Sequence, residues 1–272
     1  MIKLILSDMD NTLIPIGSTR VSPRTIEAIH ACLDAGIPFV PASGRNLVEA
    51  ARFFGNDERC YQTAVFSNGQ QVYLDGRLVF EKPLDNASLQ EAERIVMRRE
   101  GCQLISFRLE GGTDWVGAAR EDLLPIFEGT APHKGHRRKT LADLTVVKAG
   151  IINMGNRDAE LALQEELAAA CPQLDFFNTT PHWLDVVPHG WSKAEAVRLF
   201  EERLDIGAEQ ICAFGDGEND IPLLERVGHP CAVANATDHV RKVARWHVGA
   251  CADDGVACAL ERIACGLTPA DA

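Results

Sequence analysis

Two carboxylates near the start of the chain are the residues whose type and spacing most clearly suggest chemistry. Asp8 and Asp10 follow the apolar residues 4–6, which are typical of a strand buried on both faces. Residues two apart in extended backbone point to the same side, so we expect both carboxylates to face one pocket at the carboxyl end of that strand. Carboxylates held close together repel each other and favour a bound cation. A solvated turn is the plain alternative, because Asp-x-Asp alone is common.

A hydroxyl group stands at a second predicted strand end. Ser43 follows a short apolar strand expected over 37–42, and Gly44 and a predicted helix over 47–54 come next. A hydroxyl and the neighbouring backbone N–H groups at such a place would suit a phosphate oxygen. Taken by itself, Ser43 is more typical of a simple helix N-cap.

The last third of the chain adds a cation and a second acidic pair. Lys193 lies at the start of a predicted helix, and the polar stretch 215–220 follows a predicted buried strand. This stretch supplies Asp216, Asn219 and Asp220. A solvated helix lysine and an ordinary polar turn are the alternatives when each is considered alone.

The elements that must position these residues alternate between strand and helix. Ser22 predicts a helix N-cap with Pro23 at the first helical position, and Gly36 predicts the end of that helix. The pattern resumes after residue 188, where Ser192 and Glu195 predict a capping box. Such alternation implies a parallel sheet covered by helices, so we expect all of these polar groups at one edge of it.

The block from 85 to 187 has a different character, with several strands and two helices of its own. It predicts a second α+β domain inserted into the first, which leaves 1–84 and 188–272 as a discontinuous Rossmann-like core. The basic run 133–139 within the block has two interpretations, a contact for an anionic substrate and a solvated loop. The solvated loop is favoured, because charge runs usually mark exposed segments.

Length, composition and charge limit the classes of protein. The chain has 272 residues, 46% hydrophobic and 24% charged, which is ordinary for a globular protein of one or two domains. Its 27 Lys and Arg against 39 Asp and Glu give a net charge of −12, which argues against a nucleic-acid partner. Neither a membrane span nor a signal peptide is evident, so we expect a cytoplasmic protein without membrane attachment.

The nine cysteines are dispersed and contain no Cys-x-x-Cys pair. This usage predicts reduced and mostly buried thiols. No zinc site is expected, because no Cys/His cluster has metal-ligand spacing. His30 is alone in the first predicted helix and is expected at its surface rather than as a ligand.

The ordered set Asp8-x-Asp10, Ser43, Lys193 and the stretch 215–220 resembles the haloacid dehalogenase superfamily. The insertion between Ser43 and Lys193 resembles the large α/β cap (type C2) of the Cof-type branch, by position and pattern only. The resemblance covers essentially the whole chain, and its specificity lies in the order of the core motifs. It implies an α/β fold, a Rossmann-like parallel-sheet core with an inserted α+β cap domain that selects the substrate.

The chain departs from the family pattern at one position, since Asn11 stands where the family usually has glycine. Asn tolerates left-handed backbone better than most residues, so we expect the turn to form. Asp10 separates the phosphatases of the superfamily from its dehalogenases, which lack this residue. Carbon–halogen cleavage is therefore not expected.

The resemblance also implies roles for individual residues. The implied catalytic residues are Asp8, Asp10, Ser43 and Lys193. The implied substrate-binding residues are Ser43, Gly44, Lys193 and Asn219. The implied ligands of Mg²⁺ are Asp8, the main-chain carbonyl of Asp10, and Asp216, with Asp220 supporting them. In this chemistry Asp8 attacks phosphorus to form an aspartyl-phosphate, and Asp10 protonates the leaving alkoxide and later deprotonates water.

The sequence thus predicts a Mg²⁺-dependent phosphatase that acts on a small phosphorylated metabolite, with a sugar phosphate favoured, as a monomer or homodimer. Two alternatives stay open: a sugar phosphomutase, and a non-catalytic metabolite-sensing or interaction protein on the same fold. Released phosphate, as against an isomeric sugar phosphate, separates the first two reactions.

Overall fold

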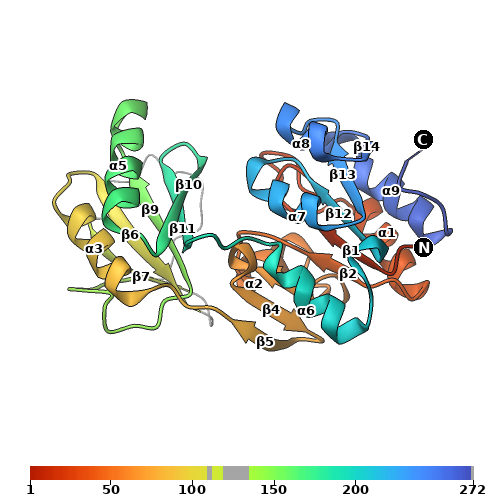
Figure 1. Ribbon diagram of the computed structural model, residues 1–272, viewed down its shortest axis with the longest axis horizontal. Coiled ribbons are helices and arrows are strands. Elements are labelled where there is room, and N and C mark those ends of the chain that lie inside the picture. The colour runs from red at the N-terminus through yellow and green to blue at the C-terminus, as the bar shows by residue number, and fades with distance from the viewer. Residues whose placement is uncertain (109–111, 119–134, 271–272) are drawn as a thin grey trace. The chain divides into compact units, whose positions relative to one another are not determined.

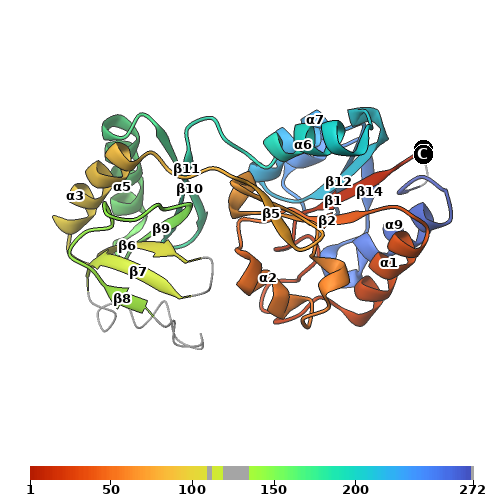
Figure 2. The same cartoon turned by 90° about the horizontal axis from the view of Figure 1, so that it is seen from below.

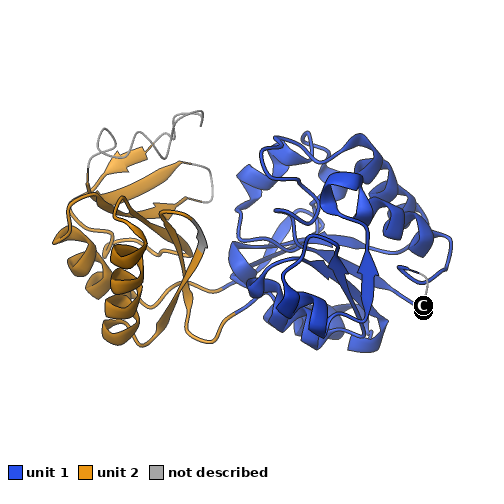
Figure 3. Ribbon diagram, turned by 90° about the horizontal axis from the view of Figure 1, so that it is seen from above, with its two compact units in different colours: residues 1–81, 192–272 blue, residues 82–191 orange. Residues whose placement is uncertain are grey.

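A computed structural model describes residues 1–108, 112–118 and 135–270. It divides into two compact units, unit 1 with residues 1–81 and 192–272, and unit 2 with residues 82–191 (Figure 3). Unit 1 holds a parallel sheet and unit 2 a mostly antiparallel one, so the predicted α/β fold class is confirmed. In the part of the chain that the structure describes, no helix is both long and apolar enough to cross a bilayer.

The sheet of unit 1 is parallel throughout and has the strand order β14-β13-β12-β1-β2 (Figure 1). Its strands are β1 (Leu4–Ser7), β2 (Phe39–Pro41), β12 (Ile211–Gly215), β13 (His229–Val233) and β14 (Trp246–Val248). Ser7 pairs with Phe214 on one side and with Pro41 on the other. The carboxyl ends of β12, β1 and β2 are therefore level, and the segments that follow them start at one edge of the sheet.

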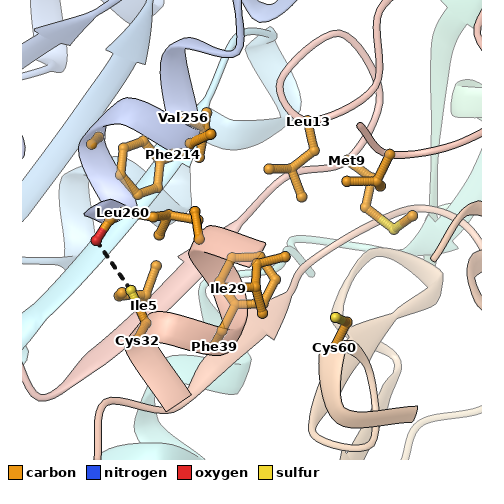
Figure 4. Packing of buried hydrophobic residues seen from close by; sticks show 14 of the residues in the cluster. Ile5, Met9, Leu13, Ile29, Cys32, Phe39, Cys60, Phe214, Val256 and Leu260 are labelled. Atoms are coloured by element: carbon orange, nitrogen blue, oxygen red, sulfur yellow. Dashed lines mark hydrogen bonds between the residues drawn. The ribbon is translucent and has the colours of Figure 1, made fainter. Parts of the chain in front are cut away.

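Helices cover both faces of this sheet because the strand residues alternate in direction. Ile5 packs with α1 (Pro23–Asp34) and α9 (Gly255–Ala264), whereas Leu4 and Leu6 pack on the opposite face. Figure 4 shows the first layer, in which the Cys32 thiol donates to the Leu260 carbonyl oxygen at 3.3 Å. The helices that accompany the opposite face are α6 (Glu195–Leu204), α7 (Ile221–Arg226) and α8 (Asp238–Val243).

A small antiparallel sheet follows α2 (Leu47–Phe53) and extends unit 1. Its strands are β3 (Ala64–Phe66), β4 (Gln71–Leu74) and β5 (Arg77–Glu81), and the short helices η1 (Glu58–Cys60) and η2 (Ser67–Gly69) flank β3. A single bridge between Ala42 and Val65 brings the end of β3 beside the end of β2. The turn after β3 thus joins the same edge.

Of the two helix N-caps predicted from the sequence, the one at Ser22 is confirmed and the one at Ser192 is wrong. Ser22 caps α1 as predicted, with its hydroxyl accepting from the Thr25 N–H at 3.1 Å. The capping box predicted for Ser192 and Glu195 is wrong. The Ser192 hydroxyl accepts from the Ala194 N–H at 3.3 Å, and α6 begins only at Glu195. A tight turn precedes the helix here, and it directs Lys193 into the interior, where it is 1% exposed.

Unit 2 is built on a six-stranded sheet of order β10-β11-β9-β6-β7-β8, antiparallel except between β7 and β8. Its strands are β6 (Cys102–Phe107), β7 (Thr113–Gly117), β8 (Gly135–Arg137), β9 (Lys148–Asn153), β10 (Leu174–Thr180) and β11 (Trp183–Pro188). The helices α3 (Asn86–Met97) and α5 (Arg157–Ala170) lie together on one side of the sheet (Figures 1 and 2). Leu104, Ile151 and Val186 point into this helix-covered core.

The other face of the unit 2 sheet carries aromatic rings. Phe107, Trp115 and Trp183 pack there with Ile105 and Ile152. The Phe107 and Trp183 rings meet edge to face with centroids 6.1 Å apart. We name this set of five residues the aromatic face.

The basic run 133–139 lies only partly in the described structure, since residues 133 and 134 fall outside it. Residues 135–137 form β8 and are exposed. The Arg138 side chain lies 2.8 Å from the buried carboxylate of Asp114. This part of the run thus includes a structural ion pair, and contact with an anionic substrate stays a hypothesis.

Candidate active site

The two strands at the centre of the unit 1 sheet deliver the first carboxylates. Asp8 directly follows β1 and Asp216 directly follows β12, its neighbour in the sheet. The Asp8 N–H continues the pairing by donating to the Phe214 carbonyl oxygen at 2.9 Å. This register holds the Asp8 side chain in the interior, where the residue is only 6% exposed.

Lys193 is the cation of the site. Its ammonium group donates to Asp8 Oδ1 at 2.5 Å and to Asp220 Oδ1 at 2.6 Å. Burial alone would lower the pKa of Lys193, but the charges of Asp220 and Asp8 overcome that effect and raise it. The lysine is therefore held in its charged form between two carboxylates.

Gly69 makes room for the turn that carries Lys193. A Cβ at this position would lie 2.5 Å from the Ser192 carbonyl oxygen, and the backbone has φ +93°. Both conditions exclude a side chain, so the turn after β3 can approach the backbone before α6 only with glycine. The turn residues Asn68 and Gly69 after an apolar strand indicate such a turn in the sequence. The sequence does not indicate that Ser192 packs against it.

Asp220 is fixed by the turn that precedes it. Its Oδ2 accepts from the backbone N–H groups of Asp216 at 3.0 Å and Gly217 at 3.1 Å. A Cβ at Gly215 would lie 2.6 Å from the Asp220 Cβ, so glycine is needed where β12 ends. The turn thereby leaves Oδ1 of Asp220 for Lys193.

Asp216 is held from the first loop of the chain. The Thr12 hydroxyl donates to Asp216 Oδ1 and the Asn11 amide to Oδ2, both at 2.8 Å. Asn11 has φ +60°, so the left-handed turn expected there does form with asparagine. Its side chain also does what the usual glycine could not, because it binds Asp216 directly.

The three carboxylates lie close enough to share one cation. One oxygen from each of Asp8, Asp216 and Asp220 lies within 4.8 Å of the others, so this carboxylate cluster could hold a metal ion. Burial is the main cause that raises the pKa of Asp8, although Lys193 opposes it. Burial likewise raises the pKa of Asp216 against the bonds from Thr12 and Asn11. The single ammonium of Lys193 does not neutralise three carboxylates. A divalent cation that binds oxygen ligands would neutralise the remaining negative charge.

Asp10 does not join this cluster through its carboxylate. Arg45 binds it in a bidentate manner, with Nε 2.8 Å from Oδ2 and one terminal nitrogen 2.6 Å from Oδ1. The Asp10 side chain is 53% exposed. Arg45 was not among the expected site residues, although it directly follows Ser43 and Gly44.

Ser43 and Gly44 lie where β2 meets the turn after β3. The Ser43 N–H donates to the Val65 carbonyl oxygen at 2.8 Å, and its hydroxyl accepts from the Arg45 N–H at 3.2 Å. A Cβ at Gly44 would lie 3.1 Å from the Asn68 amide oxygen. Ser43 therefore orders the backbone that carries Arg45, and its own side chain is buried.

Asn219 stays outside the contacts of the cluster. It is exposed in η5 (Glu218–Asp220), beside Gly217. Asn235 instead supports the first loop, since its amide donates to the Asn11 carbonyl oxygen at 2.8 Å and accepts from the Cys251 N–H at 2.8 Å. Asn235 comes just after β13, at the same end of the sheet as Asp8 and Asp216. This position is the sequence feature that could have identified it as a supporting residue.

Known proteins with matching sequence or structure cover nearly the whole chain. The sequence model of the haloacid dehalogenase-like hydrolases matches residues 5–260. A Haemophilus influenzae protein named provisionally as a phosphatase is 24% identical over 262 residues, covering 96% of this chain and 98% of its own. The 5-amino-6-(5-phospho-D-ribitylamino)uracil phosphatase YcsE of Bacillus subtilis is 25% identical over 261 residues, covering 95% and 94%.

The structure of the subclass IIB sugar phosphatase BT4131 shares the fold, with a TM-score of 0.81 at 17% identity over 96% of this chain and 98% of that one. The names of the sequence relatives bear out the predicted class of phosphatase. The match to the family model confirms the predicted family and the prediction of an enzyme. The chain belongs to the haloacid dehalogenase-like hydrolases.

Proposed function

We propose that this chain is a Mg²⁺-dependent phosphatase that hydrolyses a small phosphorylated metabolite through an aspartyl-phosphate at Asp8. The position of the Lys193 ammonium group supports this proposal most strongly. It is buried between Asp8 and Asp220, and Asp216 lies beside them. A lysine in that place favours the ionised form of Asp8, which is the form that attacks, and it offers a positive charge to the phosphoryl oxygens.

The nucleophile and the groups that hold the phosphoryl oxygens are separate residues. Asp8 Oδ1 is bound by Lys193, which leaves Oδ2 as the attacking atom. Attack forms the bond from Oδ2 to phosphorus as the ester oxygen departs. Lys193, the Ser43 hydroxyl and the backbone N–H of Gly44 would hold the equatorial oxygens, and Asn219 would orient the substrate.

Asp10 would act as general acid in the first step and general base in the second. It gives a proton to the leaving alkoxide and then takes one from the water that attacks the aspartyl-phosphate. Arg45 orients this carboxylate by two hydrogen bonds. The Asp10 carboxylate must carry a proton for the first step, so we expect one of these two bonds to open when substrate binds.

The carboxylate cluster fits Mg²⁺ because all its ligand atoms are oxygens. Asp8, Asp216 and the main-chain carbonyl of Asp10 would hold the ion, with Asp220 supporting them. When bound, Mg²⁺ supplies positive charge that lowers the repulsion between an anionic nucleophile and a phosphate.

Residues 85–187, within unit 2, would act as the cap that selects the leaving group. The aromatic face provides rings with polar groups among them. The Trp183 indole N–H donates to Asp185 Oδ1 at 2.8 Å, and Lys148 Nζ lies 4.4 Å from the Phe107 ring centroid. Apolar surface with a few oriented polar groups is typical of small-molecule sites.

A sugar or polyol phosphate is the substrate class to test first. The Bacillus subtilis relative is named for a phosphate on a ribityl chain, and the structural relative is named as a sugar phosphatase. Sugar and polyol phosphates are alkyl phosphate esters. Their leaving alkoxides need the proton that Asp10 would supply.

The test is a screen of the purified protein against sugar, polyol and nucleoside monophosphates, after EDTA treatment and with Mg²⁺ restored. We expect inorganic phosphate to be released only with a divalent cation, with the highest rates on sugar or polyol phosphates. Full turnover in EDTA would contradict the metal requirement. An isomeric sugar phosphate without phosphate release would identify a phosphomutase instead.

A further inference from the structure

A second cluster of possible metal ligands lies in unit 1, away from the residues of the proposed reaction. It consists of His30 in α1, Asp57 and Cys60, whose ligand atoms lie within 4.8 Å of one another. Cys60 is fully buried in the apolar cluster of this unit (Figure 4). His30 and Asp57 are about one-third exposed, with side-chain fractions of 29% and 31%.

The contacts of His30 with Asp57 and Cys60 converge on one ring nitrogen. His30 Nε2 lies 2.8 Å from Asp57 Oδ2 and 3.7 Å from Cys60 Sγ. A nucleophilic Cys-His-Asp arrangement needs the thiol on one ring nitrogen and the carboxylate on the other. Here both groups approach the same nitrogen, so that arrangement is excluded and a shared cation at Nε2 is favoured.

The local backbone holds two of the ligands before any ion binds. Asp57 Oδ1 accepts from the Arg59 N–H at 3.2 Å as the N-cap of η1, which leaves Oδ2 directed at His30. The Cys60 N–H donates to the Asp57 carbonyl oxygen at 3.0 Å. The short helix η1 therefore fixes the carboxylate and the thiol, and α1 brings the imidazole to them.

We propose that His30, Asp57 and Cys60 form a binding site for a zinc ion. Tetrahedral zinc with ordinary bond lengths places sulfur and nitrogen about 3.5 Å apart and nitrogen and oxygen about 3.3 Å apart. The Sγ–Nε2 distance is close to that value, and the Nε2–Oδ2 distance must open by roughly 0.5 Å as zinc replaces the hydrogen bond. Mixed sulfur, nitrogen and oxygen ligands favour zinc over magnesium.

Charge and protons balance at this site. Burial is the main cause that raises the pKa of the Cys60 thiol to about 12, so the group carries its proton when no metal is bound. Zinc binding releases that proton to solvent, and the imidazole keeps its own proton on Nδ1. One thiolate and one carboxylate then neutralise the divalent ion, and the exposed side leaves a position for water.

Cobalt reports on this site separately from the carboxylate cluster. Only a thiolate ligand gives a sulfur-to-cobalt charge-transfer band, and the three aspartates cannot produce one. Full-length protein stripped with EDTA and titrated with Co²⁺ alone should develop this band to one equivalent, and Zn²⁺ should displace it. Absence of the band in the wild-type protein would overturn the proposal.

Three variants assign the band. Cys60→Ser should abolish it and His30→Gln should weaken cobalt binding by about tenfold or more. The control C258S/C265S, which removes the two exposed thiols, should keep it. Loss of the band only in this control would overturn the proposal.

Thermal unfolding with and without Zn²⁺ gives a second measurement, which does not depend on whether Cys60→Ser folds. Zinc should raise the melting temperature of the wild-type protein more than that of His30→Gln, because binding to the native state stabilises it. Equal shifts would mean that His30 and Asp57 form only a hydrogen bond between α1 and η1.

Discussion

The two large sheets of this protein carry different kinds of functional residue. The parallel sheet of unit 1 gathers charged groups at one edge, where Lys193 contacts Asp8 and Asp220. The antiparallel sheet of unit 2 instead carries rings, with Phe107 and Trp183 on the face opposite α3 and α5. The loops after neighbouring parallel strands all begin at the same edge of the sheet, so their side chains can meet at one place. In an antiparallel sheet, alternate residues of each strand line one face, so their side chains are distributed over that face.

This difference suggests a division of labour. An edge concentrates a few charges on one reacting atom, and a face offers contact area to a larger group. We therefore expect substitutions at the edge to change the rate of the chemical steps. We expect substitutions on the aromatic face to change which substrates are used.

The largest effect is expected at the nucleophile. Asp8→Asn should lower turnover by roughly 10³-fold or more while the fold is retained, because an amide of the same shape does not attack phosphorus. Asp75→Asn is a matched control, since Asp75 is an exposed carboxyl in a turn with φ +48°, which asparagine tolerates. Steady-state phosphate release measures both, and near-wild-type rates in Asp8→Asn would refute the covalent mechanism.

An intermediate effect is expected at Asp216. Asp216→Asn should weaken Mg²⁺ binding by on the order of tenfold or more, because one of the two carboxylates proposed to hold the ion is lost. Isothermal titration of Mg²⁺ into EDTA-treated protein measures the affinity. Unchanged affinity would place the metal elsewhere.

The same variant tests how stability depends on pH. The folded-state pKa of Asp216 is raised above its ordinary 3.8, so its contribution to stability is present below that value and is lost as pH rises through the raised pKa. Metal-free Asp216→Asn should therefore lose less thermal stability than the wild-type protein as pH rises from 4 toward neutrality. A steeper fall in the variant would contradict the assigned burial of this charge.

The smallest effect is expected on the aromatic face. Trp183→Ala should raise KM for the preferred sugar or polyol phosphate by roughly 3- to 10-fold, the worth of a lost ring contact. The kcat for nitrophenyl phosphate should stay unchanged. Trp183→Phe keeps a ring and should recover most of the loss. Equal losses of kcat on every substrate would break the distinction between edge and face.

Much of unit 1 could be predicted because its signals are local. Apolar runs followed by polar residues indicated the strand ends, and Asp8 and Asp216 directly follow β1 and β12 as expected. The contact between Arg45 and Asp10 was missed because it joins side chains 35 positions apart. The capping box at Ser192 failed because burial of Lys193 between two acids outweighs a local helix signal.

Other features depend on distances that no local pattern reveals. His30 and Cys60 are 30 positions apart and meet only because α1 packs against η1. The aromatic face could be identified only from the strand order of unit 2. Gly150 lies against it, since a Cβ there would lie 2.1 Å from the Trp183 ring. An isolated glycine in a predicted strand does not identify the ring that covers it.

The measurement that tests the central claim most directly is rapid-quench trapping of the phosphoenzyme in Asp10→Asn. Nitrophenolate leaves without a proton, so the first step should proceed, but hydrolysis of the aspartyl-phosphate lacks its base. We predict a burst of about one equivalent of nitrophenol per enzyme, with phosphate bound covalently to Asp8, and no burst with an alkyl phosphate. Equal slowing of both substrates, with no phosphate on Asp8, would contradict the account.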